Sequence, residues 1–448
     1  MRHNLRSFRF SGRFSKDGRA LAAQLLRDEG FVFEPLPFYD QAMRLIHEPK
    51  PLGSSLAAHF GHIYIQDASS MLPALSLISI IGPGRDKNIC VLDMCASPGG
   101  KSSLAANELA AGFVLANEPA PKRLNTLRRN LQNLNMFNCA VSSYDAAGFP
   151  LNNFPGWDYI LLDPPCSGWG TADKAPRTLK LWRGDKLQPL IRLQRKLLAE
   201  AWRLLKPGGS LIYSTCTTNV QENEEQALHA LEYARGQARL LPLPVPEGFE
   251  FDEPCLNLSG VLRVAQTSPL GQGFFIAALQ KSASSAAFPA QAPIMPDPAA
   301  SGAQAKRTLP GGAISPEDLE TPLVNTGLLP LGRILPREGK LLFYPEAGLD
   351  LLPASFKYSG FCLGGESKAG GAPKMPDTGL RGLMPDPREA REKGAHILNM
   401  EDIAGVRKLL GGQSLNIGEN SRPMKEVGLY YKDLPLCRLK VKGKRLVM

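Results

Sequence analysis

Two cysteines stand at positions where a reactive thiol could be held. Cys166 ends the apolar stretch LLDPPC, and Cys216 ends the apolar stretch LIYSTC. Taken singly, a cysteine at the end of such a run is more often core filler than a nucleophile. Together with Asp163, however, the two thiols fit covalent activation of a pyrimidine ring. Thiolate addition at carbon 6 of cytosine makes carbon 5 able to attack an electrophilic methyl group.

The surroundings of each cysteine favour this chemistry. Asn219 and Glu222 have the N-x-x-E spacing of a capping box, which predicts a helix that opens just after Cys216 and whose N–H groups stabilise a thiolate. Around Cys166, two prolines and a Ser-Gly pair predict a stiff loop at a strand end. Asp163 could stabilise the adduct from ring nitrogen 3 if it is protonated or shares a proton. The residues alone leave open which cysteine attacks.

A glycine-rich turn lies in the segment VLDMCASPGGKS. A strand, a tight turn and a helix start in that order let backbone N–H groups approach an anionic ligand. A Walker A loop would need glycine in place of Cys95, and the GxGxxG dinucleotide pattern is absent. Glu118 follows Asp93 by 25 residues, close to the offset at which an acidic residue binds a ribose. We therefore expect a cofactor that carries a ribose, with a simple tight turn as the alternative.

Elements that would position these residues alternate between residues 76 and 281. Apolar strands and helical stretches follow one another there, which predicts βαβ units around a largely parallel sheet. The predicted strands are ICVLDMC, GFVLANE, NCAVSSYD, DYILLDPP, GSLIYSTC, GVLRVAQ and GFFIAALQ. In open α/β sheets, ligands bind outside the carboxyl ends of the strands. The acidic residues and cysteines at these strand ends should therefore gather at one edge of the sheet.

The chain is long enough for two or three domains, since it has 448 residues. We predict a small α/β module at 1–75, a catalytic domain at 76–281 and a flexible linker at 282–312, where Ala, Pro, Ser and Gly dominate. A separate C-terminal unit would occupy 313–448. A Gly/Pro-rich segment interrupts that last unit.

Charge and cysteine usage narrow the class of protein. The net charge of +10 favours a polyanionic partner, either nucleic acid or an acidic membrane surface. No basic amphipathic helix stands out and no apolar run reaches the length of a bilayer span, so we expect no membrane partner. Eight cysteines without a CxxC pair predict neither structural disulfides nor a metal site. The N-terminal stretch lacks the apolar core of a signal peptide, and a cytoplasmic protein is expected.

Five motifs in this order resemble the Sun-type RNA cytosine-C5 methyltransferases, most of all the bacterial small-subunit ribosomal RNA group lettered F. The motifs are DMCASPGGKS, NEPAPKR, LLDPPCSGWG, KPGGSLIYSTCTTNVQENE and GFFIAAL. The resemblance covers 66–281, and weaker similarity extends to both flanks. It implies an α/β fold with a Rossmann-like class I S-adenosylmethionine-dependent domain. A small N-terminal RNA-binding α/β module and a C-terminal RNA-binding, PUA-like domain would flank it.

The same resemblance assigns roles to residues. Cys216, in the Thr-Cys motif, is similar to the family's nucleophile, and Cys166, in the Pro-Cys motif, to the residue that assists release of the product, with Asp163 beside them. The implied contacts of S-adenosylmethionine are Cys95, Ala96, Ser97, Pro98, Gly99, Gly100, Lys101, Glu118, Arg123, Asp145 and Asp163.

The implied activity is transfer of a methyl group from S-adenosylmethionine to carbon 5 of a cytosine in RNA. Small-subunit ribosomal RNA is the expected substrate and a monomer the expected state. Two alternatives remain open. One is a tRNA substrate, and the other is a non-catalytic RNA-binding assembly factor, which is disfavoured because every position that the chemistry needs is filled.

Overall fold

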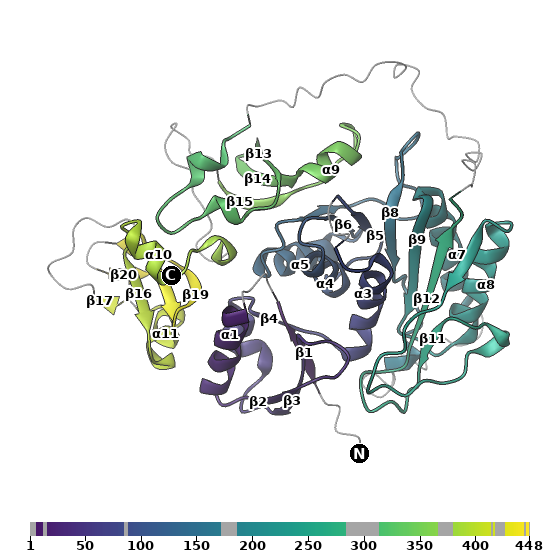
Figure 1. Cartoon of the computed structure of the whole chain (residues 1–448), viewed down its shortest axis with the longest axis horizontal. Coiled ribbons are helices and arrows are strands. Elements are labelled where there is room, and N and C mark those ends of the chain that lie inside the picture. Colours follow the sequence, from purple (N-terminus) through teal and green to yellow (C-terminus); the bar gives the residue numbers. More distant parts are fainter. Residues whose placement is uncertain are drawn as a thin grey trace.

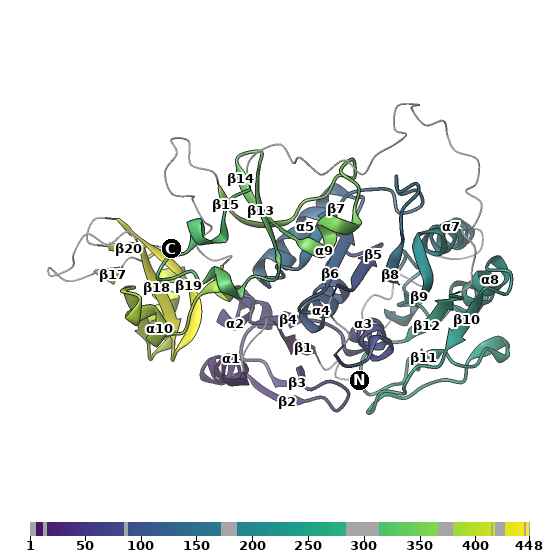
Figure 2. The ribbon, with the colours of Figure 1, turned by 45° about the horizontal axis from the view of Figure 1, so that its top comes forward.

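The computed structural model describes residues 6–11, 16–84, 88–171, 186–283, 313–365, 380–413, 415–416, 426–442 and 445–447. The predicted linker at 282–312 lies outside the described residues apart from its first two positions. Most of the Gly/Pro-rich segment of the C-terminal unit, 366–379, also lies outside them. Figures 1 and 2 show the chain from two directions.

An eight-stranded sheet forms the centre of the molecule (Figure 1), in the order β10-β12-β9-β8-β5-β6-β7, with β11 paired to β12. Its strands are β5 Cys90–Asp93, β6 Phe113–Asn117, β7 Cys139–Ser142, β8 Trp157–Leu162, β9 Leu205–Thr215, β10 Ala238–Leu241, β11 Leu262–Val264 and β12 Phe274–Lys281. Strands β5 to β9 run parallel, whereas β12 is antiparallel to both β9 and β10. The predicted strands and the Rossmann-like sheet are confirmed, and β10 was not predicted.

Helices cover both faces of this sheet. Successive residues of a strand point to opposite faces, so Val91 packs with the cluster that contains α3, α4 and α5, and Leu92 packs with the cluster that contains α7 and α8. The helices are α1 Lys16–Asp28, α2 Leu56–His59, α3 Ala68–Ile81, α4 Gly100–Glu108, α5 Pro121–Asn133, α7 Gln188–Leu204, α8 Glu224–Tyr233, α9 Glu346–Leu351, α10 Pro387–Glu392 and α11 Ile403–Leu410. Along the described ranges, none of the helices has both the length and the apolar character needed to cross a bilayer.

Three smaller sheets flank the central one. The first has the order β2-β3-β1-β4, the second β13-β14-β15 and the third β16-β18-β19-β20-β17. Their strands are β1 Ser7–Phe10, β2 Val32–Pro35, β3 Ala42–His47, β4 Ile63–Ile65, β13 Gly332–Arg337, β14 Lys340–Pro345, β15 Phe361–Gly365, β16 Ile397–Met400, β17 Leu415–Asn416, β18 Glu426–Tyr431, β19 Leu434–Lys442 and β20 Arg445–Val447. The division of the chain at 75, 281 and 312 stays a prediction.

The two ends of the chain share one hydrophobic core. Phe8 and Leu25, from the N-terminal sheet and α1, belong to the same buried cluster as Leu429 and Leu434 of the C-terminal sheet. The two regions lie side by side in Figures 1 and 2. The buried guanidinium of Arg381 joins them further, because it donates to the backbone carbonyls of Phe60 and Gly61.

Replacing Arg381 should therefore weaken the whole molecule. We expect Arg381→Met to lower the free energy of unfolding by about 2–4 kcal/mol, since two buried carbonyl groups lose their donor. Urea denaturation followed by circular dichroism measures the change. Arg388→Met on exposed α10 is the matched control, and equal losses in both variants would contradict this explanation.

Candidate active site

The carboxyl ends of the parallel strands bring the predicted residues to one edge of the central sheet. Strand β5 ends at Asp93, β6 is followed by Glu118, β8 by Asp163 and β9 by Cys216. These strands are neighbours and parallel. The expectation that these residues gather at one edge, where open α/β sheets bind ligands, is confirmed for their positions.

The two predicted cysteines are adjacent. The Sγ atoms of Cys166 and Cys216 lie 3.3 Å apart, and both side chains are partly buried. The hydrogen bond from the Cys166 thiol lowers the pKa of Cys216, and the nearby Lys101 ammonium adds to this effect. The same bond raises the pKa of Cys166, together with burial and the negative charges of Asp163 and Glu222. Cys216 is therefore the thiol that ionises first, while Cys166 keeps its proton and donates it.

The predicted capping box does not form. Asn219 caps a single 3-10 turn, Val220–Glu222, by accepting a hydrogen bond from the N–H of Gln221 at 3.1 Å, and α8 begins only at Glu224. The backbone N–H of Asn219 donates to the Thr217 hydroxyl instead of to a glutamate. The capping-box prediction was thus wrong, because the Glu222 carboxylate accepts hydrogen bonds from Ser167 and Gln194 and none from the backbone N–H of Asn219.

The carboxylate of Glu222 joins the two loops that carry the cysteines. It is fully buried, and it accepts hydrogen bonds from the N–H of Ser167 at 2.9 Å, the Ser167 hydroxyl and the Gln194 amide at 3.0 Å. The Ser167 and Thr217 hydroxyls lie 2.7 Å apart, which adds a second link between the loops. A buried carboxylate is tolerated only when donors surround it. This network fixes the spacing of the two sulfur atoms.

Two glycines allow a third close contact beside the cysteines. A Cβ atom at Gly170 would lie 2.1 Å from the carbonyl oxygen of Gly273 and 2.9 Å from that of Cys216. The N–H of Gly170 also donates to the Cys216 carbonyl at 3.1 Å. The backbones can approach this closely only because neither glycine carries a side chain. This explains a glycine in each of the motifs LLDPPCSGWG and GFFIAAL.

An ion pair completes the cysteine side of the site. The Lys101 ammonium lies 2.6 Å from the Asp163 carboxylate, which also accepts a hydrogen bond from the Ser214 hydroxyl at 3.1 Å. Burial alone would lower the pKa of Lys101, but the Asp163 carboxylate raises it above its usual value. The sequence assigned Lys101 to the cofactor loop, whereas its ammonium points to the residue beside the thiols. A proton donor and a carboxylate therefore accompany the thiolate.

The predicted cofactor loop is closely packed. Gly99 has a left-handed φ of 108°, and a Cβ atom there would come within 3.0 Å of the Leu127 side chain. Glu118 is buried, and its carboxylate lies 3.4 Å from the guanidinium of Arg123. The same guanidinium donates to the Ser97 carbonyl at 3.0 Å. Three of the predicted cofactor residues, Ser97, Glu118 and Arg123, are thus brought together.

Asp93, at the end of β5, and two predicted cofactor residues, Cys95 and Asp145, differ in their burial. Burial raises the pKa of Asp93 to about 6, and its carboxylate accepts a hydrogen bond from Ser102 at 2.6 Å. Burial also raises the pKa of Cys95, which makes this thiol unreactive. Asp145 is exposed in the loop after β7, where it accepts from the N–H of Ala147 at 3.0 Å. Asp145 therefore remains accessible to a ligand.

Sequence analysis missed two groups that position the site. Glu222 was assigned to a helix cap, although it joins the cysteine loops. Arg9, from the N-terminal sheet, is fully buried and donates to the Gly100 carbonyl at 3.2 Å and to the Ser103 hydroxyl at 2.6 Å. It thereby ties the first turn of α4 to β1. One sequence carries no signal for either contact, because both partners are distant along the chain.

Comparisons with known proteins agree with this geometry. The family model described as 16S rRNA methyltransferase RsmB/F matches residues 80–280. The ribosomal RNA small subunit methyltransferase F of Shewanella amazonensis is 34% identical over 262 residues, 58% of this chain and 55% of that protein. Its counterpart from Shewanella sp. strain MR-4 is 29% identical over 426 residues, 94% of this chain and 85% of its own length. A solved methyltransferase homologue from Pyrococcus horikoshii is 32% identical, with a TM-score of 0.51, over 62% of this chain and 86% of its own.

The extent of these matches differs between relatives. With several of the curated relatives, including the one from Shewanella amazonensis, the chain aligns over about half of their length. The region that the family model matches, residues 80–280, contains the cysteine loops and the strands of the central sheet apart from the last residue of β12.

The unequal acidity of the two thiols can be tested by alkylation. Because only the thiolate reacts, Cys216 should be alkylated by iodoacetamide with an apparent pKa below the ordinary thiol value of 9.0, and faster than Cys166 at neutral pH. Cys166→Ala should raise that apparent pKa, since the S–H donor is lost, while Cys166→Ser keeps a donor and should raise it less. Peptide mass spectrometry at a series of pH values measures each rate, and faster reaction of Cys166 in the parent protein would reverse the assignment.

Proposed function

Because the chain belongs to the Sun-type family of RNA methyltransferases, we propose that it transfers a methyl group from S-adenosylmethionine to carbon 5 of a cytosine in small-subunit ribosomal RNA. The observation that carries the proposal is the pair of sulfur atoms 3.3 Å apart at the ends of β8 and β9. Two thiols of unequal acidity suit a reaction in which one sulfur attacks and the other assists its departure.

The residues at the neighbouring strand ends fit S-adenosylmethionine, which supplies an electrophilic methyl group when bound. A ribose offers hydroxyl donors, and the buried carboxylate of Glu118 lies one strand from Asp93, where such hydroxyls are bound in related folds. Asp145 presents an exposed carboxylate at the next strand end. The left-handed turn at Gly99 precedes the first turn of α4, where backbone N–H groups of a helix start suit an anionic group of a ligand. This set of acidic groups suits a cofactor that is cationic.

Cys216 begins the proposed reaction. Its thiolate, held by the S–H of Cys166, attacks carbon 6 of the cytosine, and the electron pair of the carbon 5–carbon 6 bond becomes available at carbon 5. Carbon 5 can then accept the methyl group. The Lys101–Asp163 pair beside the sulfur atoms holds a proton near ring nitrogen 3 during the addition, so that Asp163 acts by sharing a proton, one of the two forms that the sequence suggested.

Cys166 acts at the end of the proposed reaction. After methylation, a water molecule takes the proton from carbon 5, the electron pair of that bond restores the carbon 5–carbon 6 double bond, and the bond between carbon 6 and the Cys216 sulfur breaks. A hydrogen bond from the Cys166 thiol stabilises the departing thiolate, just as it lowers the pKa of Cys216 before the reaction. Loss of this donor slows elimination more than addition, because the charge on sulfur develops as the bond breaks.

The flanking regions enter the proposal as RNA-binding parts. We propose that the N-terminal module at 1–75 and the C-terminal unit at 313–448, whose five-stranded sheet would form a PUA-like domain, contact the RNA around the target. The net charge of +10 supports a polyanionic partner. RNA is recognised through shape and unpaired loops, which a surface built from both flanks can contact together.

The two cysteines should fail in different ways. Cys216→Ala should abolish both methylation and the covalent RNA adduct, because no sulfur attacks carbon 6. Cys166→Ala should instead accumulate the adduct, since elimination is slowed. Denaturing gels of each variant incubated with S-adenosylmethionine and labelled RNA measure the adduct. The roles are reversed if the adduct persists in the Cys216 variant and is absent from the Cys166 variant.

Glu118 should matter for the cofactor alone. Glu118→Ala is expected to weaken S-adenosylmethionine binding by about 1.5–3 kcal/mol, as a charge-assisted pair of hydrogen bonds is lost. Isothermal titration calorimetry measures the affinity, and the exposed Glu247→Ala variant is the control. Equal affinity of the Glu118 variant and the parent protein would refute the ribose assignment.

A further inference from the structure

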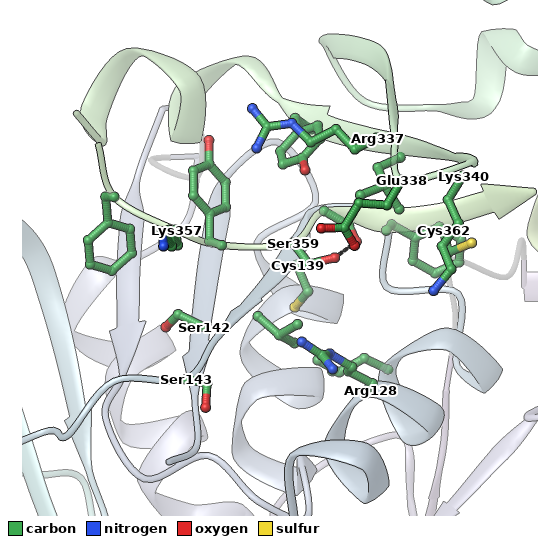
Figure 3. Close-up of a pocket in the computed structure, with 18 of the residues that line it drawn as sticks. Arg128, Cys139, Ser142, Ser143, Arg337, Glu338, Lys340, Lys357, Ser359 and Cys362 are labelled. Atoms are coloured by element: carbon green, nitrogen blue, oxygen red, sulfur yellow. Dashed lines mark hydrogen bonds between the residues drawn. The ribbon is translucent and has the colours of Figure 1, made fainter. Parts of the chain in front are cut away.

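A cleft of about 1200 Å³ lies outside the site described above. Helix α5 and strand β7 form one wall, and the hairpin β13–β14 with strand β15 forms the other (Figure 3). Backbone hydrogen bonds of 2.8 Å join Val141 and Ser359 in both directions at the base of the cleft. The Gln132 amide donates to the Cys362 carbonyl at 2.7 Å. Segments more than two hundred residues apart in sequence are therefore fixed against each other.

The cleft carries positive charge on both walls. Arg128 extends from α5, and Arg337, Lys340 and Lys357 extend from the opposite wall (Figure 3). All four side chains are exposed, and none forms an ion pair within the part of the chain that the structure describes. Glu338 supplies the one carboxylate among the described lining residues. The cleft therefore suits an anionic ligand.

The hairpin presents its charges in a fixed arrangement. Arg337 and Lys340 are partners in the register of β13 and β14, and the two residues between them have positive φ values of 51° and 72°. Two consecutive residues with positive φ form the tight turn that matches the twist of a hairpin. The Arg337 guanidinium also lies 5.4 Å from the centre of the Tyr344 ring. Both cationic groups are held at the rim of the cleft.

Aromatic rings continue the cleft toward the cofactor edge. The rings of Tyr144 and Phe356 lie 4.6 Å apart, and the N–H of Lys357 donates to the Tyr144 hydroxyl at 2.7 Å. Tyr144 immediately precedes Asp145, which is a predicted cofactor residue. On the other side, the sequence of α5, PKRLNTLRRNLQN, contains basic residues and no acidic ones. The positive surface thus runs from α5 through the cleft to the edge of the site.

We propose that this cleft binds the sugar–phosphate backbone of the substrate RNA outside the target cytosine. The proposal rests on the function proposed above, since it locates a second contact for the same RNA. Cations spread over two walls match successive phosphates along a strand better than they match one compact anion. Arginine and lysine side chains beside an exposed aromatic ring are groups with which proteins bind single-stranded RNA, and the ring of Tyr144 is partly exposed here. Phosphate contacts of this kind position the RNA without reading its sequence.

A pair of matched double variants tests the proposal in the full chain. Arg128→Ala with Lys340→Ala removes one cation from each wall, while Arg192→Ala with Lys196→Ala removes two exposed cations from α7, which packs on β8 and β9, whereas the cleft lies at β7 (Figure 1). Each variant is titrated with a transcript of small-subunit ribosomal RNA at several salt concentrations. The slope of log affinity against log salt should become shallower by about 1–2 in the cleft variant and change less in the control.

Kinetics and a charge reversal complete the test. The cleft variant should raise the KM for RNA by about fivefold or more, with kcat and the affinity for S-adenosylmethionine unchanged, since each phosphate contact contributes to binding alone. Glu338→Lys, which adds a cation at the hairpin tip, should steepen the salt slope.

The outcomes separate the two proposals. Unchanged slopes in the cleft variant, or equal changes in the α7 control, would overturn the cleft as an RNA site even where methylation is normal. A parent protein that forms no 5-methylcytosine in this RNA would overturn the proposed function, whereas the salt slopes would still report on the cleft.

Discussion

The carboxylate of Glu222 is fully buried and connects the loop that follows β9 with the loop that follows β8. Its donors come from Ser167 and from Gln194 on α7, so the cysteine loops and a helix of the sheet's outer layer meet at one negative charge. Removing one partner of such a buried charge costs about 3–5 kcal/mol, because the charge that remains is unpaired. Neither loop could hold its sulfur alone, since a separation of 3.3 Å requires both loops to be fixed.

The same arrangement makes two identical side chains unequal. The largest cause is the hydrogen bond between the two thiols, which lowers the pKa of Cys216 and raises that of Cys166. Asp163 raises the pKa of both thiols, whereas Lys101 lowers only that of Cys216 and Glu222 raises only that of Cys166. The difference in acidity therefore follows from one hydrogen bond and from unequal charges around two identical side chains.

Sequence reasoning found what is encoded locally. The parallel strands were predictable because their apolar runs are continuous, as expected for strands buried on both faces. Strand β10 was missed, since the sequence ARLL interrupts its apolar residues with a basic one. The capping box failed for a related reason: its spacing is a local signal, and the donor that Glu222 uses lies 55 residues away at Ser167. Lys101 lies in the first turn of α4, and its partner Asp163 could not be deduced from spacing.

Contacts between segments far apart in sequence also fix where an RNA bound in the cleft would lie relative to the two cysteines. The second wall of the cleft is paired to β7 by its own backbone, and the C-terminal sheet shares its core with the N-terminal one. The second wall cannot move independently of the central sheet without exposing Leu352 and Phe356, which belong to the buried cluster on one face of that sheet. Tyr144 lines the cleft, and the next residue along the chain is Asp145, a predicted cofactor residue. The cleft is therefore adjacent to the predicted cofactor site. An RNA bound there is therefore concentrated near the cysteines, because phosphate contacts far from the reacting atoms contribute to its binding.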